Sequence, residues 1–388
     1  MTARNARKMV HVIHLSTVHS ALDSRILERE ARTLSEAGYR LSVIARHPAR
    51  ETLNGIDIVP VRTSRTRFDR LIVSPWSALR QCLALKPNIV HIHDPELIPV
   101  GLVLRLLRRT VIYDVHEDLP KQIIHKDWIP RVLRTKLGGA IAWLEPLALR
   151  RFNLVVVVRP PVRDRLSAHN VTRTLLLRNF PRRDDYAHPP AIAVDQPSID
   201  IHPDHVRIVY CGAITGVRGA REMVAAIGNC DPSLHARLIL AGPCASDLLT
   251  ELQGMQGWAA TTYLGRIPPA EVPALLASSY LGLAVLHPIP NYVGETPTKL
   301  FEYMAAGLPV ICSDFSPYDV TVASYRCGQL LDPYDIAAIT RAIENLIRNP
   351  QLAREMGARG VRAVHEVYNW ETESVGLITA YDQLSNIG

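Results

Sequence analysis

Short apolar runs and amphipathic stretches alternate along the first half of the chain. The apolar runs are rich in Val and Ile, which is typical of strands. Between the first two runs lies a helical pattern at residues 24–38, and Gly38 suits the end of a helix. Strands that alternate with helices predict βαβ units and a parallel sheet. The predicted strands of this half cover residues 9–15, 40–45, 88–93, 110–115 and 153–158.

The same alternation restarts in the second half after a proline-rich interruption. Residues 181–205 hold five prolines and show neither a helical nor a strand period, so they are predicted to be a linker. The pattern therefore predicts two doubly wound α/β domains, at residues 1–180 and 206–369, facing across a cleft where ligands bind at strand C-terminal ends. The predicted strands of the second half cover residues 206–212, 236–242, 261–265, 280–286 and 308–313.

The composition of the chain indicates its class of protein. With 388 residues, 47% hydrophobic and 21% charged, the chain is expected to be soluble and globular, with more than one core. Its six cysteines are scattered, without a CxxC pair, which favours reduced thiols and a cytoplasmic location. The basic N-terminus is similar to a signal peptide, but His11 and His14 interrupt its apolar run, so a first core strand is expected.

The net charge of +7 conceals a difference between the two halves. Residues 1–185 hold 32 Lys and Arg against 17 Asp and Glu, a balance of +15, whereas residues 186–388 hold 12 against 20, a balance of −8. Basic and apolar residues mix at 104–109 and 131–152, a composition suited to an anionic membrane surface on the inner face of the membrane. The alternative is that the apolar residues pack on the sheet. No nucleic-acid module accompanies the charge, so no nucleic-acid partner is expected.

A glycine-rich turn opens the second domain. In YCGAITGVRGAREM (210–223), a strand runs into Gly212 and then into Arg218 ahead of a helix. Glycines allow a close approach to phosphate, a helix N-terminus offers N–H groups, and Arg donates two hydrogen bonds to an anion. The spacing is not the GxGxxG of dinucleotide sites, and a plain strand–helix connection is the alternative.

A second anion site is expected in GETPTKLFEYMAAGLPVICSD (294–314). Thr296 is predicted to cap a helix with Pro297 at its first position, leaving N–H groups near Thr298 and Lys299 for an anion. Leu300, Phe301 and Met304 would share the apolar face, whereas Lys299 and Glu302 lie opposite. The alternative is an ordinary helix whose polar face meets water.

These two segments resemble the donor-binding domain of GT-B glycosyltransferases of family 4. The resemblance extends to HIHDPE (91–96), DVHED (114–118), LLRNFP (176–181) and YNWETE (368–373), and so covers essentially the whole chain. It implies two Rossmann-like domains, the first for an acceptor and the second for a nucleotide-sugar donor. It also implies a C-terminal helix, at 370–388, that crosses back to the first domain.

By the same resemblance, the donor site contains Gly212 and Thr298 and three charged side chains. Glu302 corresponds to the carboxylate that holds the ribose hydroxyls, and Arg218 and Lys299 to contacts with the diphosphate. This chain departs from the family in two places. Ala213 stands where many relatives have Arg, and the usual E-x7-E pair is shortened, so that Glu295 is only an approximate match for the first glutamate.

In the first domain, His116 follows a predicted strand and corresponds to the family's histidine at the reaction centre. The predicted acceptor-binding residues are His93 and Asp94, in HIHD, and Asp23 and Arg25, at the start of a helix. For Asp23, capping of that helix is the preferred alternative. His91 and His93 share one face of a strand, but the sequence offers no further metal ligand near them. The family is generally metal-independent, and neither a metal nor another cofactor is expected.

The resulting hypothesis is a retaining glycosyltransferase of bacterial polysaccharide or glycoconjugate biosynthesis. It would move a hexose-type sugar from a UDP- or GDP-sugar to a hydroxyl of a sugar or lipid-linked saccharide. A sugar-nucleotide epimerase of the same architecture and a non-catalytic nucleotide-binding regulator remain as alternatives. Donor hydrolysis assays distinguish the three.

Overall fold

The computed structural model describes residues 7, 9–61, 66, 69–116, 118–124, 130–187, 205–289, 292–293, 297–315 and 317–386. The chain divides into two compact units, one formed by Met1–Asn179 with Thr372–Gly388 and the other by Phe180–Glu371. The predicted linker begins with a short helix, α8 (Arg183–Ala187), which its sequence pattern does not predict. Residues 188–204 of that linker lie outside the described residues.

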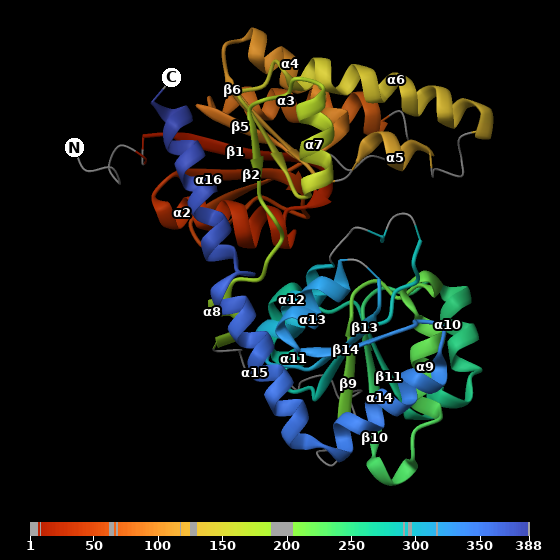
Figure 1. Ribbon diagram of the computed structural model, residues 1–388. Coiled ribbons are helices and arrows are strands. Elements are labelled where there is room, and N and C mark those ends of the chain that lie inside the picture. Colours follow the sequence, from red (N-terminus) through yellow and green to blue (C-terminus); the bar gives the residue numbers. More distant parts are fainter. Residues whose placement is uncertain are drawn as a thin grey trace. The chain divides into compact units, whose positions relative to one another are not determined.

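The first unit contains an eight-stranded sheet in the order β3-β4-β2-β1-β5-β6-β7-β8 (Figure 1). Every neighbouring pair is parallel except β3 and β4. Apart from β3, the order is that of a doubly wound Rossmann-like sheet, in which ligands bind where the strand order reverses, here between β1 and β5. The strands are β1 (His11–Ser20), β2 (Arg40–Arg46), β3 (Glu51–Leu53), β4 (Ile56–Pro60), β5 (Ile89–Ile92), β6 (Thr110–Val115), β7 (Leu154–Val157) and β8 (Thr174–Leu176).

The two faces of this sheet differ in character. Ile13 and Leu15 point to an apolar face that packs against α3, α4 and α7. Because side chains alternate along a strand, His14 points to the other face, where η1 and α16 contribute Glu30 and Tyr381. The helical segments are η1 (Ser24–Ala31), α2 (Arg32–Ala37), η2 (Asp69–Val73), α3 (Ser74–Ala84), η3 (Pro95–Leu97), α4 (Ile98–Leu106), α5 (Leu119–Ile124), α6 (Arg131–Leu149), α7 (Pro160–Ala168) and α16 (Trp370–Ser385).

The second unit contains six parallel strands in the order β11-β10-β9-β12-β13-β14 (Figure 1). This is the Rossmann order, and its reversal point lies between β9 and β12. One face packs on α9 and α14 and the other on α12 and α15, so both faces are covered, as the apolar runs predicted. The strands are β9 (Val206–Cys211), β10 (Ala236–Ala241), β11 (Thr261–Gly265), β12 (Leu281–Ala284), β13 (Val310–Ser313) and β14 (Gly328–Leu331).

The remaining helices of this unit connect the strands and cover the sheet. Besides α8, they are η4 (Gly216–Arg218), α9 (Ala220–Gly228), η5 (Pro232–Leu234), α10 (Ser246–Gln253), η6 (Gln256–Ala260), η7 (Pro269–Glu271), α11 (Val272–Ala277), α12 (Thr298–Ala305), α13 (Tyr318–Tyr325), α14 (Ile336–Arg348) and α15 (Pro350–Glu366).

Candidate functional site

Two cationic side chains meet at the glycine that ends β9. Gly212 has a φ of 135°, a conformation that side-chain-bearing residues rarely adopt. A Cβ atom built on Gly212 would lie 3.0 Å from Lys299 Nζ and 3.7 Å from an amino nitrogen of Arg218. Gly212 therefore lets the backbone pass directly beside both cations, at the reversal point of the sheet.

Lys299 is the buried member of this pair. Its side chain comes from the first turn of α12 and is only 7% exposed. Its ammonium lies 3.8 Å from the centroid of the Tyr210 ring, but has no hydrogen-bond partner among the residues that the structure describes. Burial, together with the charge of Arg218, lowers the pKa of Lys299 to about 7. An anion bound here would supply the missing partner.

Arg218 is held beside Lys299 by two hydrogen bonds. Its Nε donates to the hydroxyl of Tyr292 at 3.0 Å, and an amino nitrogen donates to the carbonyl of Ala213 at 3.4 Å. The hydroxyl of Tyr210 donates to the same carbonyl at 2.9 Å. The backbone of Ala213 thus orients Arg218, although the side chain of Ala213 carries no charge.

The helix that carries Lys299 begins one residue later than predicted. Pro297 precedes α12 as its N-cap residue, so the prediction that it occupies the first helical position is wrong. Thr298 takes that position, and Gly307, with a φ of 74°, follows the helix end. Glu302 is half-buried, and its charge interacts with that of Lys299. The proposed sugar contact Glu295 and the predicted cap Thr296 lie outside the described residues.

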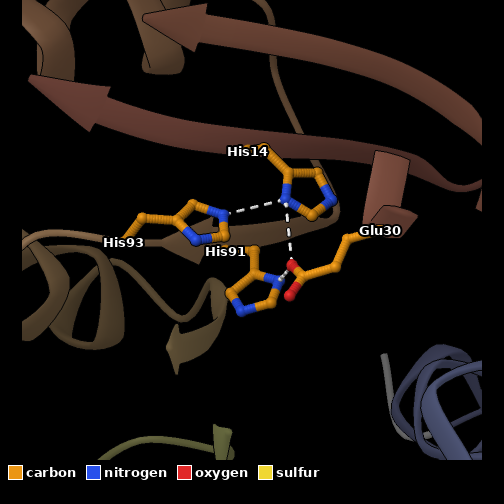
Figure 2. A group of neighbouring side chains, drawn as sticks. All are labelled: His14, Glu30, His91 and His93. Carbon is orange, nitrogen blue, oxygen red and sulfur yellow. Dashed lines mark hydrogen bonds and ion pairs between the residues drawn. The ribbon is translucent and has the colours of Figure 1, made fainter. Parts of the chain in front are cut away.

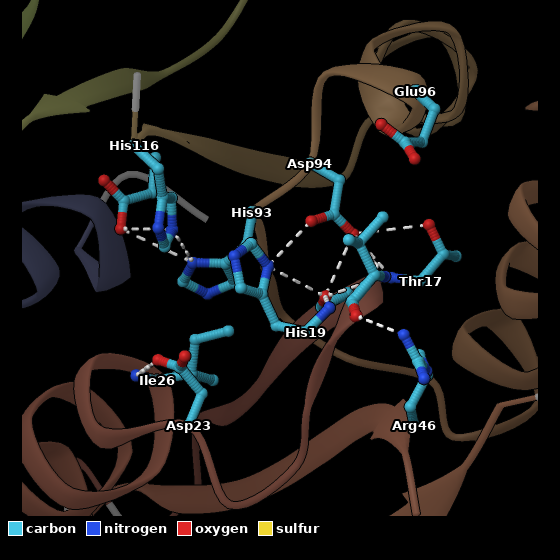
Figure 3. A network of polar contacts seen from close by, with 12 residues as sticks. Thr17, His19, Asp23, Ile26, Arg46, His93, Asp94, Glu96 and His116 are labelled. Carbon is cyan, nitrogen blue, oxygen red and sulfur yellow. Dashed lines mark hydrogen bonds and ion pairs between the residues drawn. The ribbon is translucent and has the colours of Figure 1, made fainter. Parts of the chain in front are cut away.

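The first unit places His116 directly after β6 at the edge of a polar network (Figure 3). Its Nε2 lies 3.2 Å from Asp114 Oδ2 and 3.2 Å from His93 Nδ1. Its ring stacks on that of His19, with 4.8 Å between centroids. The side chain of His116 is 20% exposed, whereas Asp114 and His93 are buried beneath it. The side chain of His19 is 30% exposed, so His116 and His19 are the members of this chain of contacts that a ligand can reach.

Asp94 anchors residues 16–18, near the C-terminal end of β1. Its carboxylate accepts hydrogen bonds from the Ser16 hydroxyl at 2.9 Å and from the backbone N–H groups of Thr17 and Val18 (Figure 3). Burial acts to raise its pKa, but the hydrogen bond to His19 at 2.8 Å and these donors outweigh burial and hold the pKa at about 2. Acceptor binding by Asp94 stays a prediction.

Asp23 and Arg25 have structural partners at the start of η1. Asp23 caps the segment by accepting hydrogen bonds from the backbone N–H groups of Arg25 at 2.9 Å and Ile26 at 3.1 Å, which confirms the capping alternative. Each nitrogen of the buried Arg25 guanidinium has a partner within the unit. Those partners are Asp114, Glu30, Asn179 and the carbonyl of Leu177. Arg25 thus binds buried carboxylates, and a direct contact with an acceptor stays a prediction.

His93 also belongs to a second group that the sequence does not reveal. Figure 2 shows His14, Glu30, His91 and His93 with their polar atoms turned toward one another. Sequence reasoning places His91 and His93 on one face but finds no further ligand. The structure adds His14, which is the register partner of His91 in the β1–β5 pair, and Glu30 from η1. Strand register pairs His14 with His91, whereas Glu30 joins them through the packing of η1 beside the sheet, and neither relation appears in a local sequence pattern.

Burial determines the protonation of this group when no cation is present. It holds the pKa values of His14 and His91 well below their usual range and lowers that of His93 to about 4. The three rings are therefore neutral at neutral pH. Burial also raises the pKa of Glu30 well above its usual range, despite the charge of Arg25.

Two known sequence families match the two parts of the chain. Residues 24–176 match "Glycosyltransferase Family 4", and residues 194–362 match "Glycosyl transferases group 1". The chain is 30% identical over 152 residues to the D-inositol 3-phosphate glycosyltransferase of Gordonia bronchialis, a match that spans 38% of this chain and 32% of that relative. It is 24% identical over 397 residues to the phosphatidyl-myo-inositol mannosyltransferase of Mycolicibacterium smegmatis, covering 96% of this chain and 92% of the relative.

Solved structures share the fold of both units. Anabaena HepE, crystallised in complex with UDP and glucose, has a TM-score of 0.70 at 13% identity, covering 96% of this chain and all of that one. The two Rossmann-like sheets, the cationic turn after β9 and the matches to both halves point to the same family. The chain belongs to the GT-B glycosyltransferases of family 4.

Proposed function

We propose that the protein transfers a hexose-type sugar, with retention, from a UDP- or GDP-sugar to a hydroxyl of an acceptor. One observation carries this proposal: the buried ammonium of Lys299 has no hydrogen-bond partner among the described residues and faces Arg218 beside Gly212. Two neighbouring cations match a ligand with two negative charges. A nucleoside diphosphate sugar has that charge in its diphosphate group.

The reaction requires stabilisation of the leaving group. The bond between the anomeric carbon and the phosphate oxygen breaks, a bond to the acceptor oxygen forms, and the acceptor proton passes to the departing diphosphate. Arg218, Lys299 and the N-terminus of α12 would stabilise the negative charge that develops on the phosphate oxygen of the departing diphosphate. The proposed reaction includes no metal ion, because these groups supply the positive charge.

The remaining contacts of the proposal are divided between the two units. Glu302, one turn after Lys299, would accept hydrogen bonds from the ribose hydroxyls, and Glu295 would contact the donor sugar. In the first unit, His116 would contact the transferred sugar. The name of the mannosyltransferase relative and the UDP and glucose in HepE support a hexose donor but leave the base and the sugar open.

The proposed acceptor is a saccharide on a lipid at the inner face of the membrane. Across the described residues, no helix is both long enough and apolar enough to span a bilayer. However, α6 exposes five large apolar side chains, and at about 100° per residue they fall within about 120° of the helix circumference. They are Leu133, Leu137, Trp143, Leu144 and Leu147. Such a face, with exposed basic residues such as Lys136 and Arg150, suits attachment to anionic lipid.

A binding and turnover series tests the proposal. UDP, GDP, ADP and TDP are compared by thermal shift and calorimetry, with the bare nucleosides as controls. The preferred diphosphate should bind far more tightly than its nucleoside, and the matching sugar donor should be hydrolysed slowly without an acceptor. Equal binding of nucleoside and diphosphate would overturn the assigned anion site. Epimerised donor would indicate the alternative enzyme, and binding without turnover of any donor would indicate a regulator.

A further inference from the structure

Four buried side chains from three segments converge beneath the candidate reaction centre of the first unit. His14 lies on β1, His91 on β5 directly opposite it in register, His93 just after β5, and Glu30 on η1. One nitrogen or oxygen atom from each of the four lies within 4.8 Å of the other three, and all four residues are buried (Figure 2). Three neutral imidazoles and a carboxylate form a recognised set of ligands for a transition-metal ion.

Three of the six distances between these atoms are close to those of a tetrahedral site, and the others are no longer than 4.8 Å. His14 Nδ1 lies 2.9 Å from His93 Nε2 and 3.7 Å from Glu30 Oε2, and His91 Nδ1 lies 3.5 Å from the same oxygen. His91 Nδ1 also lies 2.9 Å from the hydroxyl of Tyr381, which a bound metal ion would displace. Zinc binds nitrogen and oxygen at about 2.0–2.2 Å, which separates neighbouring ligand atoms by about 3.3 Å in a tetrahedron. Shifts of a few tenths of an ångström would therefore bring these three contacts to bonding geometry.

The charges around the group leave one carboxylate to be neutralised. Arg25 Nε lies 2.7 Å from Asp114 Oδ2 and 3.0 Å from Glu30 Oε1, so one cation serves two buried carboxylates. Glu30 Oε2 faces the imidazoles and accepts no hydrogen bond from any described residue. A buried carboxylate in this position needs either a proton or a further cation.

We propose that His14, Glu30, His91 and His93 bind a divalent transition-metal ion of the zinc class. The site is closed by four protein ligands and lies inside the unit, which is typical of structural rather than catalytic metal sites. The ion would tie β1, β5 and η1 together, so its binding free energy would add to the stability of the first unit. This role is separate from the proposed transfer reaction, which uses no metal.

A bound ion would also determine the protonation of His93. With Nε2 on the metal, the proton of that ring must lie on Nδ1, which is 3.4 Å from Asp114 Oδ2 and 3.2 Å from His116 Nε2. Hydrogen bonds from metal-bound imidazoles commonly orient neighbouring side chains. The metal would therefore orient His116 through His93, without contact with the substrate.

Metal analysis of the full chain tests the proposal without any substitution. Protein produced without a histidine tag and dialysed against metal-free buffer should retain about one equivalent of zinc. Chelation should lower the midpoint of thermal unfolding, and Zn²⁺ should restore it. Cobalt added to the chelated protein should give the visible absorption bands of four-coordinate Co²⁺. Protein that holds no metal and shows neither a thermal nor a spectroscopic response to Zn²⁺ or Co²⁺ would overturn the proposal and leave a proton on Glu30.

Substitutions then test whether the zinc binds at these four residues. His91→Asn and Glu30→Gln should lower the bound zinc severalfold. The matched control is His11→Asn, because His11 is also buried on β1 but bonds to Ser42 and the carbonyl of Leu85, outside the group. This control should retain its zinc. Zinc that persists in both variants, His91→Asn and Glu30→Gln, would contradict the assignment. Diphosphate binding to the second unit should not change in these variants. Measuring it separates a failure of the metal site from a failure of the proposed function.

Discussion

Lys299 Nζ lies 3.8 Å from the centroid of the Tyr210 ring, and this contact provides the buried ammonium with a source of negative potential. The ring faces a cation that has no hydrogen-bond partner within the described part of the chain and whose pKa is about 7. The charge of Lys299 therefore depends on pH in the neutral range before a ligand binds. The binding of an anion should therefore depend on pH.

The first prediction concerns this pH dependence. A diphosphate beside Lys299 stabilises its charged form, so binding above pH 7 takes up a proton. The affinity for a UDP-sugar, whose diphosphate keeps its charge in this range, should fall by up to about tenfold per pH unit above 7 and level off below it. Lys299→Met should bind more weakly and lose this dependence. Calorimetry from pH 6 to 9 measures the affinities of both proteins. A wild-type affinity that does not change with pH over that range would contradict the assignment.

A second prediction follows from the position of Glu302. If Glu302 accepts hydrogen bonds from the ribose, Glu302→Ala should weaken nucleotide binding by about 1.5–3 kcal/mol, the scale for hydrogen bonds to a charged group. The ribose contact should also make wild-type binding sensitive to the sugar of the nucleotide, so 2′,3′-dideoxy analogues should lose affinity only with wild-type protein. Glu355→Ala, on the exposed surface of α15, serves as the control. Unchanged affinity in the folded Glu302 variant would restore the solvated-helix alternative.

A third prediction separates Arg218 from its exposed neighbour. Arg218→Ala should reduce binding of diphosphate-linked ligands far more than binding of the nucleoside, because only the former carry the charge that Arg218 faces. Arg221 is three residues away and is exposed, with an ion pair to Glu251. Arg221→Ala should therefore have little effect on either ligand. Equal losses for diphosphate and nucleoside in Arg218→Ala would mean that Arg218 supports the fold instead.

Local sequence pattern was sufficient for the main strands and for the helix that ends at Gly38, whose φ is 103°. It missed the short strands β3, β4, β8 and β14, because runs of three to five residues are too short to show a clear period. It also predicted no helix at Arg183–Ala187, where the polar residues of α8 give no apolar face. Short elements depend on their neighbours in the sheet or core, which a local pattern does not contain.

The candidate site likewise contains some features that the sequence predicts and others that it does not. Gly212, Arg218 and Lys299 lie in two motifs that can be read along the chain, and the structure brings them together. The burial of Lys299 against Tyr210 could not be predicted, because it depends on how α12 packs beside β9. Likewise, the pairing of His14 with His91 follows from strand register, which connects positions far apart in the sequence. Residues that act through tertiary contacts were therefore the ones that sequence reasoning missed.

The fourth prediction concerns His116. Its replacement by Ala should lower the transfer rate by about tenfold to a hundredfold, the scale of one lost hydrogen bond to a developing charge. Nucleotide binding should stay nearly unchanged, because the cationic turn belongs to the other unit. His169→Ala, on the exposed end of α7, is the control and should retain full activity. Normal turnover by the His116 variant would exclude this residue from the reaction centre.

The last prediction tests the exposed face of α6, a long helix that packs beside α5 (Figure 1). Trp143 and Leu144 are 65% and 53% exposed there, and each would contribute about 1.5–3 kcal/mol on full burial in a lipid surface. Trp143→Glu with Leu144→Glu should therefore weaken binding to anionic vesicles by tenfold or more, on the order expected for one such side chain. Val375→Glu, an equally exposed apolar position on α16, should bind like the wild type. Sedimentation with anionic and neutral vesicles at low and high salt measures these differences, since attraction to an anionic surface weakens with salt. Two outcomes would favour a soluble acceptor: wild-type protein that binds anionic and neutral vesicles equally, or double-variant protein that binds as well as the control.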